Sequence, residues 1–478
     1  MTFNVLFTVS RRPVAAGSLM LALSCMSAAN AGNTFSGALP AGHADHSLPS
    51  PPREKSDLTL RDAALLALQR NPELAAFARE TRALQGVTQQ AGLLPNPDLV
   101  IMAENAGNVQ KANNNPALVS AREVEQQETT IRLHQVIELG GKRAARVRAA
   151  SLGEEVAGQD YEARRVGLIA QVANLFTEVL AGQERLRLAE GNVQLAQKVV
   201  NSVSKRVQAG KVPPIEETKV GVALSTTRIE LEQARRDLAA ARKRLALLWG
   251  NSSPQFNQVL GDLKSLVALP SFEVLAERVL TSPMALRAMK NIEQRKALLE
   301  VEHTRRVPNL TVIAGVLNHI HTGGTTVVAG ISMPLQLFDR NQGNLREAHQ
   351  RVDKAMDEQA ATDLQLKTEL AQTYEALSAA QNEIGILRIE VLPAARSAFD
   401  VTNRGYELGK FGFLEVLDAQ RTLFQNEVLY VRALANYQRL VNEIERLIAA
   451  PIEGVSDGAL SPPLTSEISA NTDSRSGL

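Results

Sequence analysis

The segment AGKVPPIE (residues 209–216) recurs as LGKFGFLE (residues 408–415), 199 residues further along the chain. In each copy the glycine follows a long stretch of helical pattern, and a second helical stretch begins directly after the turn. Glycine at a helix end supplies a left-handed cap, and Pro213 and Pro214 prevent the first helix from continuing. The two segments therefore predict two helical hairpins with similar tight turns.

The rest of the chain is also written twice. Before the long helices the offset between the copies is 211, so that Asn71-Pro72 matches Ser282-Pro283. A unit of roughly 190 residues is far longer than the repeat of a solenoid or a propeller, so we predict two copies of one assembly fused in tandem. We place the first copy at residues 57–250, an inter-repeat linker at 251–269 and the second copy at 270–450.

Both ends of the chain lie outside the two copies. Arg11-Arg12 precede a mostly apolar stretch, and Ala29-Asn30-Ala31 fits the small-x-small pattern of signal peptidase sites, so we expect residues 1–31 to be a signal peptide. Cleavage there removes Cys25, the only cysteine; in the alternative, Cys25 remains as the lipidated first residue of a lipoprotein. Residues 32–56 and 451–478 are rich in small and polar residues and are expected to be a flexible N-terminal segment and a flexible C-terminal tail.

The composition excludes several classes of function. Lys+Arg 52 against Asp+Glu 51 gives a net charge of +1, which provides no general attraction to nucleic acid. The sequence carries no phosphate-binding loop, no nucleophile elbow and no paired-histidine zinc motif. His319 and His321 could supply only two ligands to a metal ion, fewer than a usual site needs. We therefore expect no enzyme, no cofactor, no bound metal and no nucleic-acid partner.

Each copy contains two segments with the alternating pattern of a strand. They are Pro97–Asn105 and Glu128–Leu139 in the first copy, and the segments beginning at Leu310 and at Val327 in the second. After the signal no apolar stretch is long enough for a transmembrane helix, but strands of about 9–12 residues approach the length that crosses a bilayer when tilted. Four strands cannot close a barrel, since the smallest have about eight. Either several chains share one barrel, or the strands form an ordinary antiparallel sheet of a soluble protein.

A very long helix follows each strand pair, from Lys142 to Ala209 and from Asn344 to Leu408. At about 1.5 Å per residue each helix would reach roughly 100 Å. Apolar residues advance by threes, fours and sevens, which is a seam of coiled-coil type: Leu370, Tyr374, Leu377, Ile384, Leu387 and Val391 in the second copy. Pro393 is expected to bend that helix or to mark a local change of pitch. One copy therefore reads helix, strand, strand, long helix, turn, helix.

This order, doubled and preceded by an export signal, resembles the TolC family of outer-membrane efflux proteins over about residues 57–450. The resemblance rests on motifs that occur in the same order: Ile137-Glu-Leu-Gly-Gly141-Lys142-Arg143, Leu392-Pro393-Ala394, and Leu414-Glu415-Val416-Leu417-Asp418-Ala419. Within the family, Met333–Gly343 looks most like the CzcC-type branch, which serves cobalt-zinc-cadmium pumps. Drug or peptide export is the alternative inside the family.

The resemblance implies a mainly helical homotrimer. Three chains would share a twelve-stranded β-barrel in the lipid of the outer membrane, continued by an α-helical coiled-coil tunnel across the periplasm. The implied activity is passive conduction, driven by an inner-membrane RND pump that is joined to the channel by a periplasmic adaptor. A periplasmic coiled-coil adaptor or scaffold is the alternative of a different class, although two hairpins, each preceded by a strand pair, favour the channel.

The resemblance also implies roles at the hairpin turns. The acids six residues after each glycine, Glu216 and Glu415, and Asp418 one turn further, are expected to constrict the tunnel; taken alone, Glu415 and Asp418 would be read as a solvated helix face. Tyr406 is expected to link neighbouring hairpins, and the tip and gate comprise Tyr406, Gly210, Gly409, Lys410 and Phe411. The turns that would contact the adaptor include Lys211, Val212, Pro213, Pro214, Gly412 and Phe413.

The second turn departs from the family pattern at one position. Phe411 stands where the resemblance implies a basic residue, so a salt bridge from this position to Glu216 is not expected. Lys410 or Arg404 could take its place, or aromatic packing could hold the closed state instead.

Overall fold

The computed structural model describes residues 57–104, 128–319 and 324–452. The expected signal peptide with Cys25, the expected flexible segment 32–56, His321, and the tail beyond Ile452 lie outside these residues. No helix in the described part of the chain combines the length and the apolar character needed to cross a membrane.

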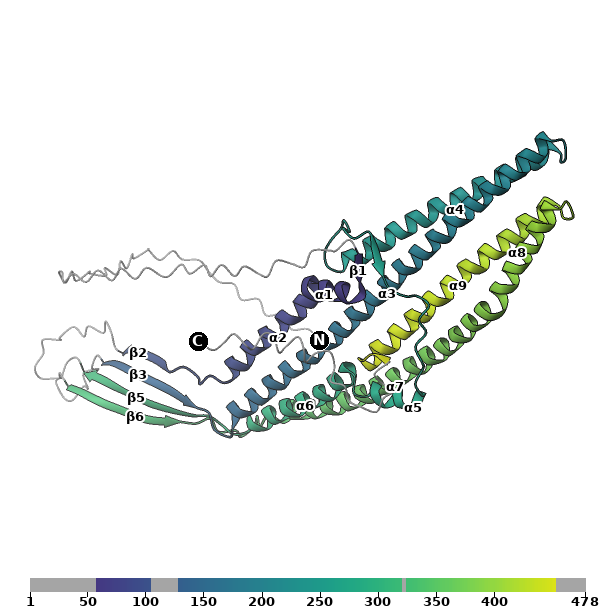
Figure 1. Ribbon diagram of the computed structural model, residues 1–478. Coiled ribbons are helices and arrows are strands. Elements are labelled where there is room, and N and C mark those ends of the chain that lie inside the picture. The colour runs from purple at the N-terminus through teal and green to yellow at the C-terminus, as the bar shows by residue number, and fades with distance from the viewer. Residues whose placement is uncertain (1–56, 105–127, 320–323, 453–478) are drawn as a thin grey trace, which may run out of the picture. The chain divides into compact units, whose positions relative to one another are not determined.

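The strands of both copies join one antiparallel sheet in the order β2-β3-β5-β6 (Figure 1). Strand β2 spans Asp98–Glu104, β3 Glu128–Ile137, β5 Leu310–His319 and β6 Gly324–Ser332. The pairing of β3 with β5 unites the two copies, because these strands come from different halves of the chain. The strand segments predicted from the alternating pattern are confirmed.

The register of the sheet gathers its apolar residues on one face. Ile131 lies opposite Ile101 on one side and Val316 on the other, and Val316 lies opposite Val327. Directly opposed residues point to the same face of a sheet. In the isolated chain this face is uncovered, and its exposed large apolar residues are Leu99, Ile101, Ile131, Leu133, Val312, Val316, Val327 and Ile331.

The helices of the first copy are α1 (Leu60–Arg70), α2 (Pro72–Ala91), α3 (Lys142–Gln208) and α4 (Pro214–Leu247). Helix α3 has 67 residues, as the sequence predicts, and packs against α2, α4, α6 and α9. Asn71 caps α2, since its side chain accepts a hydrogen bond from the Leu74 N–H at 3.0 Å.

The second copy repeats this order. Its helices are α5 (Phe272–Val279), α6 (Pro283–Thr304), α7 (Gln342–Ile386), the π-helix η2 (Leu387–Val391), α8 (Leu392–Glu407) and α9 (Phe413–Ile448). Ser282 caps α6 as Asn71 caps α2, by accepting from the Ala285 N–H at 3.5 Å. In both cases proline follows the cap, where its missing N–H costs nothing.

The π-helix before Pro393 is the local change of pitch that the proline predicts. There the Leu392 N–H donates to the Leu387 carbonyl, five residues back instead of four. The spacing of the inward-facing residues changes just after this turn: Ile384 and Val391 lie seven residues apart, whereas the buried residues Ala395 and Phe399 lie four and eight residues beyond Val391. The wide turn takes up the additional residue.

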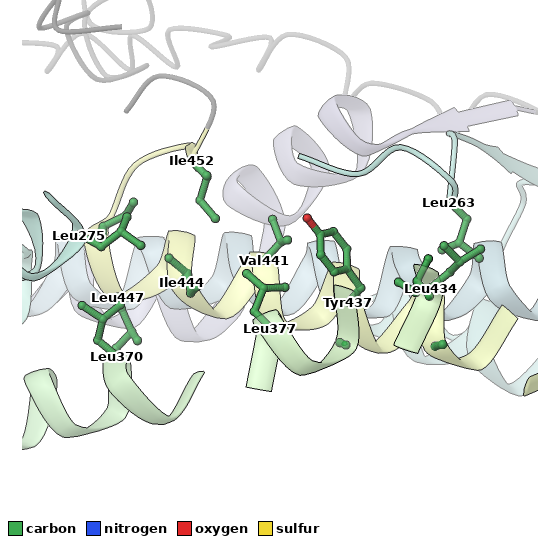
Figure 2. Packing of buried hydrophobic residues seen from close by; sticks show 14 of the residues in the cluster. Leu263, Leu275, Leu370, Leu377, Leu434, Tyr437, Val441, Ile444, Leu447 and Ile452 are labelled. Carbon is green, nitrogen blue, oxygen red and sulfur yellow. The ribbon is translucent and has the colours of Figure 1, made fainter. Parts of the chain in front are cut away.

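The largest core cluster lies between α7 and α9 (Figure 2). Leu370 and Leu377 of α7 are fully buried, as are Tyr437 and Leu447 of α9. Complete burial of a leucine side chain stabilises the fold by about 1.5–3 kcal/mol. The coiled-coil seam expected along this helix is confirmed, because its six predicted residues are all buried in this cluster or packed against it.

Two segments that the sequence assigns to a linker and a tail contribute to the core. Strand β4 (Gln258–Leu260), within the linker, pairs in parallel with β1 (Asp57–Thr59), and Val259 is buried. Ile452 is only 1% exposed, and its N–H donates to Glu445 Oε1 at 3.0 Å. Strands of three residues are too short to show an alternating pattern, which is why the sequence did not predict them.

Candidate functional site

Both hairpin turns have the same backbone structure. In the first, Gly210 has a φ of 68°, its N–H donates to the Val207 carbonyl at 2.9 Å, and the Lys211 N–H donates to the Arg206 carbonyl at 2.9 Å. In the second, Gly409 has a φ of 73°, and the Gly409 and Lys410 N–H groups make the same pair of bonds. This Schellman motif requires a left-handed residue, which glycine provides without strain.

The two hairpins touch through Arg206 of α3 and Tyr406 of α8. Arg206 Nη1 donates to the Tyr406 carbonyl oxygen at 3.1 Å, and the guanidinium carbon lies 4.5 Å from the centroid of the Tyr406 ring. Tyr406 is 4% exposed, and its hydroxyl oxygen is buried without a hydrogen-bond partner in the described part of the chain. Tyr406 thus joins the two hairpins through its backbone and its ring face.

A small core, which we call the tip core, lies behind this contact. It contains Val199, Val203, Val220, Phe399, Tyr406, Phe413 and Val416. The Tyr406 and Phe413 rings meet edge to face, with centroids 6.1 Å apart and planes at 67°. Phe411 packs on the backbone of Gly405, where a Cβ atom would come 2.1 Å from Phe411 Cδ2. Within a single chain, Phe411 thus contacts the last turn of α8.

The three candidate gate acids lie at the starts of the return helices. Glu216 is half-buried in the first turn of α4, whereas Glu415 and Asp418 are exposed on α9. A carboxylate is favoured in the first turn of a helix by the unpaired N–H groups there. Among the described residues none of these three carboxylates has an ion-pair partner, so the charges of Glu415 and Asp418 face solvent in the isolated chain.

The other turn residues divide by exposure. Lys211, Pro213, Pro214, Lys410 and Gly412 are exposed, and Val212 is half-buried. Phe413 differs, because it is 3% exposed and belongs to the tip core. It stabilises the hairpin from inside, and its side chain presents little surface to a partner.

Arg206 is the residue of this site that sequence reasoning missed. A basic residue in the last turn of a helix is common, because it interacts favourably with the helix dipole, so the position carried no distinctive signal. The aligned residue of the second copy is Gly405, against which Phe411 packs. A comparison of the two copies at this position could have indicated that the two turns are supported differently.

Helix α3 begins with four basic residues, Lys142, Arg143, Arg146 and Arg148, of which the first and the third have polar partners in the described structure. Arg146 forms an ion pair with Glu138, and Lys142 Nζ donates to Asn309 Oδ1. These bonds tie the start of α3 to the ends of the strands of both copies. Among the residues that the structure describes, no group of three or more histidine, cysteine, aspartate or glutamate side chains is placed to hold a metal ion.

Comparison with known proteins gives one consistent result. The family model described as "Outer membrane efflux protein" matches residues 64–251 and 279–450. The cobalt-zinc-cadmium resistance protein CzcC of Cupriavidus metallidurans is 36% identical over 398 residues, which cover 83% of this chain and 91% of that protein. The nickel-cobalt-cadmium resistance protein NccC of Alcaligenes xylosoxydans xylosoxydans is 26% identical over 284 residues, or 59% of this chain and 62% of that protein.

Solved structures show the same fold. A crystal structure of CusC matches with a TM-score of 0.67 over 82% of this chain and 92% of that chain, at 16% sequence identity. The outer-membrane channel OprN also matches with a TM-score of 0.67, over 82% of this chain and 90% of that chain, at 18% identity. At these identities the likeness concerns the fold alone.

Proposed function

The chain belongs to the outer membrane efflux protein family, as its motifs predict, and from this premise we propose that it is the outer-membrane channel of a three-part pump for divalent heavy-metal cations. The observation that carries the cargo class is the 36% identity to CzcC over most of both chains. Conduction through such a channel is passive, and the chain needs no catalytic residue for it. The energy would come from the inner-membrane pump.

The uncovered face of the sheet supports insertion into a membrane as part of a shared barrel. Val327 is 78% exposed and Ile331 75% exposed in the isolated chain, a state that water disfavours. The outer strands β2 and β6 each leave one edge unpaired within this sheet. Three chains joined edge to edge would close twelve strands into a barrel, which satisfies the edges and places the apolar face in lipid.

The exposed parts of the hairpin turns are the proposed contact with a periplasmic adaptor. Lys211, Pro213 and Pro214 in the first turn and Lys410 and Gly412 in the second present surface without belonging to the tip core. Phe413 acts indirectly, by holding the second turn in shape. The inner-membrane pump would then reach the channel through the adaptor.

The acids next to these turns are the proposed constriction. In a trimer, Glu415 and Asp418 would each occur three times around one axis, and Glu216 would add three further carboxylates. Rings of acidic side chains attract cations and exclude anions in channels generally. The Arg206–Tyr406 contact is proposed to hold the two hairpins of each chain together in the closed state.

Metal tolerance of a bacterium that lacks its own channel of this type tests the function. The full chain is expressed together with a matching pump and adaptor, and growth is measured in rising Co²⁺, Zn²⁺ and Cd²⁺ and, in parallel, in antibiotics. We expect tolerance to the metals alone. Tolerance to antibiotics without tolerance to metals would assign the chain to drug export. A purified protein that forms no ion-conducting pore in planar bilayers would contradict the channel function.

A further inference from the structure

Two histidines from different helices face each other near the sheet. His303 lies at the end of α6 and His349 near the start of α7, with ring centroids 6.1 Å apart and planes at 87°. Helix α6 leads into β5 and α7 leaves β6, so the two helices pack side by side and run in opposite directions (Figure 1). In the described part of the chain neither imidazole has a hydrogen bond or an ion pair.

The backbone around this pair is fixed by a neighbouring contact. Asn341, directly before α7, has a left-handed backbone with a φ of 61°. Its Nδ2 donates to the Glu302 carbonyl oxygen at 2.9 Å and to Glu302 Oε2 at 2.8 Å. Because Glu302 precedes His303 in the chain, this contact holds the start of α7 against the end of α6. The separation of the two histidines is therefore set by the fold.

That separation suits two imidazoles on one metal ion. A zinc–nitrogen bond is about 2.0–2.1 Å long and a ring nitrogen lies about 1 Å from the ring centre, so two rings on a tetrahedral ion have centroids roughly 5 Å apart and this pair must close by about 1 Å to coordinate one ion. His349 is exposed and His303 half-buried, so the His349 ring has room to turn toward His303. Imidazole binds zinc, copper, nickel and cobalt and disfavours magnesium and calcium.

The charged residues around the two histidines determine how strongly they would bind a cation. Glu300 lies one turn before His303 on α6, and Asp353 lies one turn after His349 on α7. Because the helices are antiparallel, both acids lie on the side away from the sheet, in the same layer, and both are exposed. Arg306 and Arg346 lie one turn toward the sheet and oppose a cation. The acids are not placed as direct ligands, so water would complete the coordination and binding would be weak.

We propose that His303 and His349, at the contact of α6 with α7, form a weak binding site for a divalent transition-metal cation such as Zn²⁺ or Co²⁺. The site uses two neutral imidazoles, with Glu300 and Asp353 supplying negative charge one turn away. Weak, reversible binding suits a conduit, because a tightly held ion would not leave. The description of this ion as exported cargo rests on the function proposed above, whereas the binding itself does not.

Zn²⁺ binding by the full-length, detergent-purified protein tests the site. Equilibrium dialysis in metal-free buffer compares the wild type with His303→Ala, His349→Ala and the double variant, while His134→Ala on the sheet serves as the matched control. We expect the double variant to bind one Zn²⁺ fewer per chain, each single variant to weaken that site by about tenfold or more, and the control to match the wild type. Excess Mg²⁺ should leave the bound Zn²⁺ in place.

Copper spectroscopy provides a second measurement that does not depend on how the His303 and His349 variants fold. Electron spin-echo spectra of Cu²⁺ on a variant in which His43, His46, His319 and His321 are replaced by alanine should show one population of ions with two imidazole ligands. Equal Zn²⁺ binding by the wild type and the double variant, or copper bound by single imidazoles alone, would overturn the site. Loss of metal tolerance with an intact Zn²⁺ site would instead count against the export function, so the two failures can be told apart.

Discussion

Arg206 covers Tyr406: its guanidinium carbon lies 4.5 Å from the ring centroid, and its Nη1 donates to the Tyr406 carbonyl oxygen at 3.1 Å. The contact joins the last turns of two long helices from different copies of the duplicated unit. A cation over an aromatic ring contributes about 0.5–1 kcal/mol at exposed sites, and a hydrogen bond from a charged group about 1.5–3 kcal/mol. One side chain therefore supplies a substantial share of the restraint between the hairpins.

Arg206→Ala is expected to loosen the tips and to raise the single-channel conductance in planar bilayers. Tyr406→Phe is the matched control, because the hydrogen bond uses the backbone carbonyl and the hydroxyl has no partner among the described residues. This control should leave the conductance unchanged. An equal rise in both variants would mean that the hydroxyl, and not the carbonyl, maintains the contact.

The exposed acids of α9 should control the response to divalent cations. Glu415→Gln combined with Asp418→Asn removes two negative charges per chain from the tip, so block of the channel by divalent cations should weaken strongly, since acidic rings bind such ions. Asp357→Asn combined with Glu375→Gln makes the same change of charge on α7, away from the turns. Current recordings in rising Mg²⁺ or Co²⁺ compare the two. Unchanged block in the α9 variant would remove these acids from the constriction.

Gly405→Ala should destabilise the second turn. The added Cβ would come 2.1 Å from Phe411 Cδ2, so the ring must move, and overpacking of this kind costs about 1–3 kcal/mol. Gly191→Ala on α3 has open space around it and should stabilise the helix by up to about 1 kcal/mol. Trypsin cleavage after Lys410 measures the opening of the turn. Gly405→Ala should raise the cleavage rate, whereas Gly191→Ala should lower it or leave it unchanged.

Tyr437→Phe should lower the thermal stability. The Tyr437 hydroxyl donates to the Val267 carbonyl at 2.8 Å and so ties the inter-repeat linker to α9; such a bond contributes about 1 kcal/mol. Burial raises the pKa of Tyr437, so the hydroxyl remains a donor in mildly alkaline buffer. Tyr430→Phe is the control, since Tyr430 packs against the same core without a hydrogen bond of this kind in the described structure. Equal melting temperatures for the two variants would contradict the assignment.

Much of the architecture was readable in the sequence because its signals are long and occur twice. The seam from Leu370 to Val391 repeats every seven residues, and the strands alternate over up to ten residues, so each pattern outweighs local exceptions. Glycine at each turn predicts a left-handed backbone, and Gly210 and Gly409 both have a positive φ. The copies also allowed each weak signal to be checked against its counterpart.

Contacts between distant segments could not be predicted in the same way. Nothing local to Arg206 indicates that it meets Tyr406, because the contact depends on how two hairpins pack. Strands β1 and β4 have three residues each and are defined only by one another. Ile452 is buried because α9 ends close to the core, and the sequence around Ile452 does not indicate this packing.

The π turn at Leu387–Val391 affects which insertions and deletions this helix can accept during evolution. In an unbroken α-helix one added residue rotates everything beyond it by about 100°, which would turn Phe399 and Tyr406 away from the tip core. Here the wide turn at Leu387–Val391 takes up one additional residue, and both cores keep their partners. A gain or loss of one residue is therefore tolerated at this turn and harmful along the rest of the helix. Related proteins whose second long helix is one residue shorter should therefore lack the residue at this turn and not elsewhere in the helix.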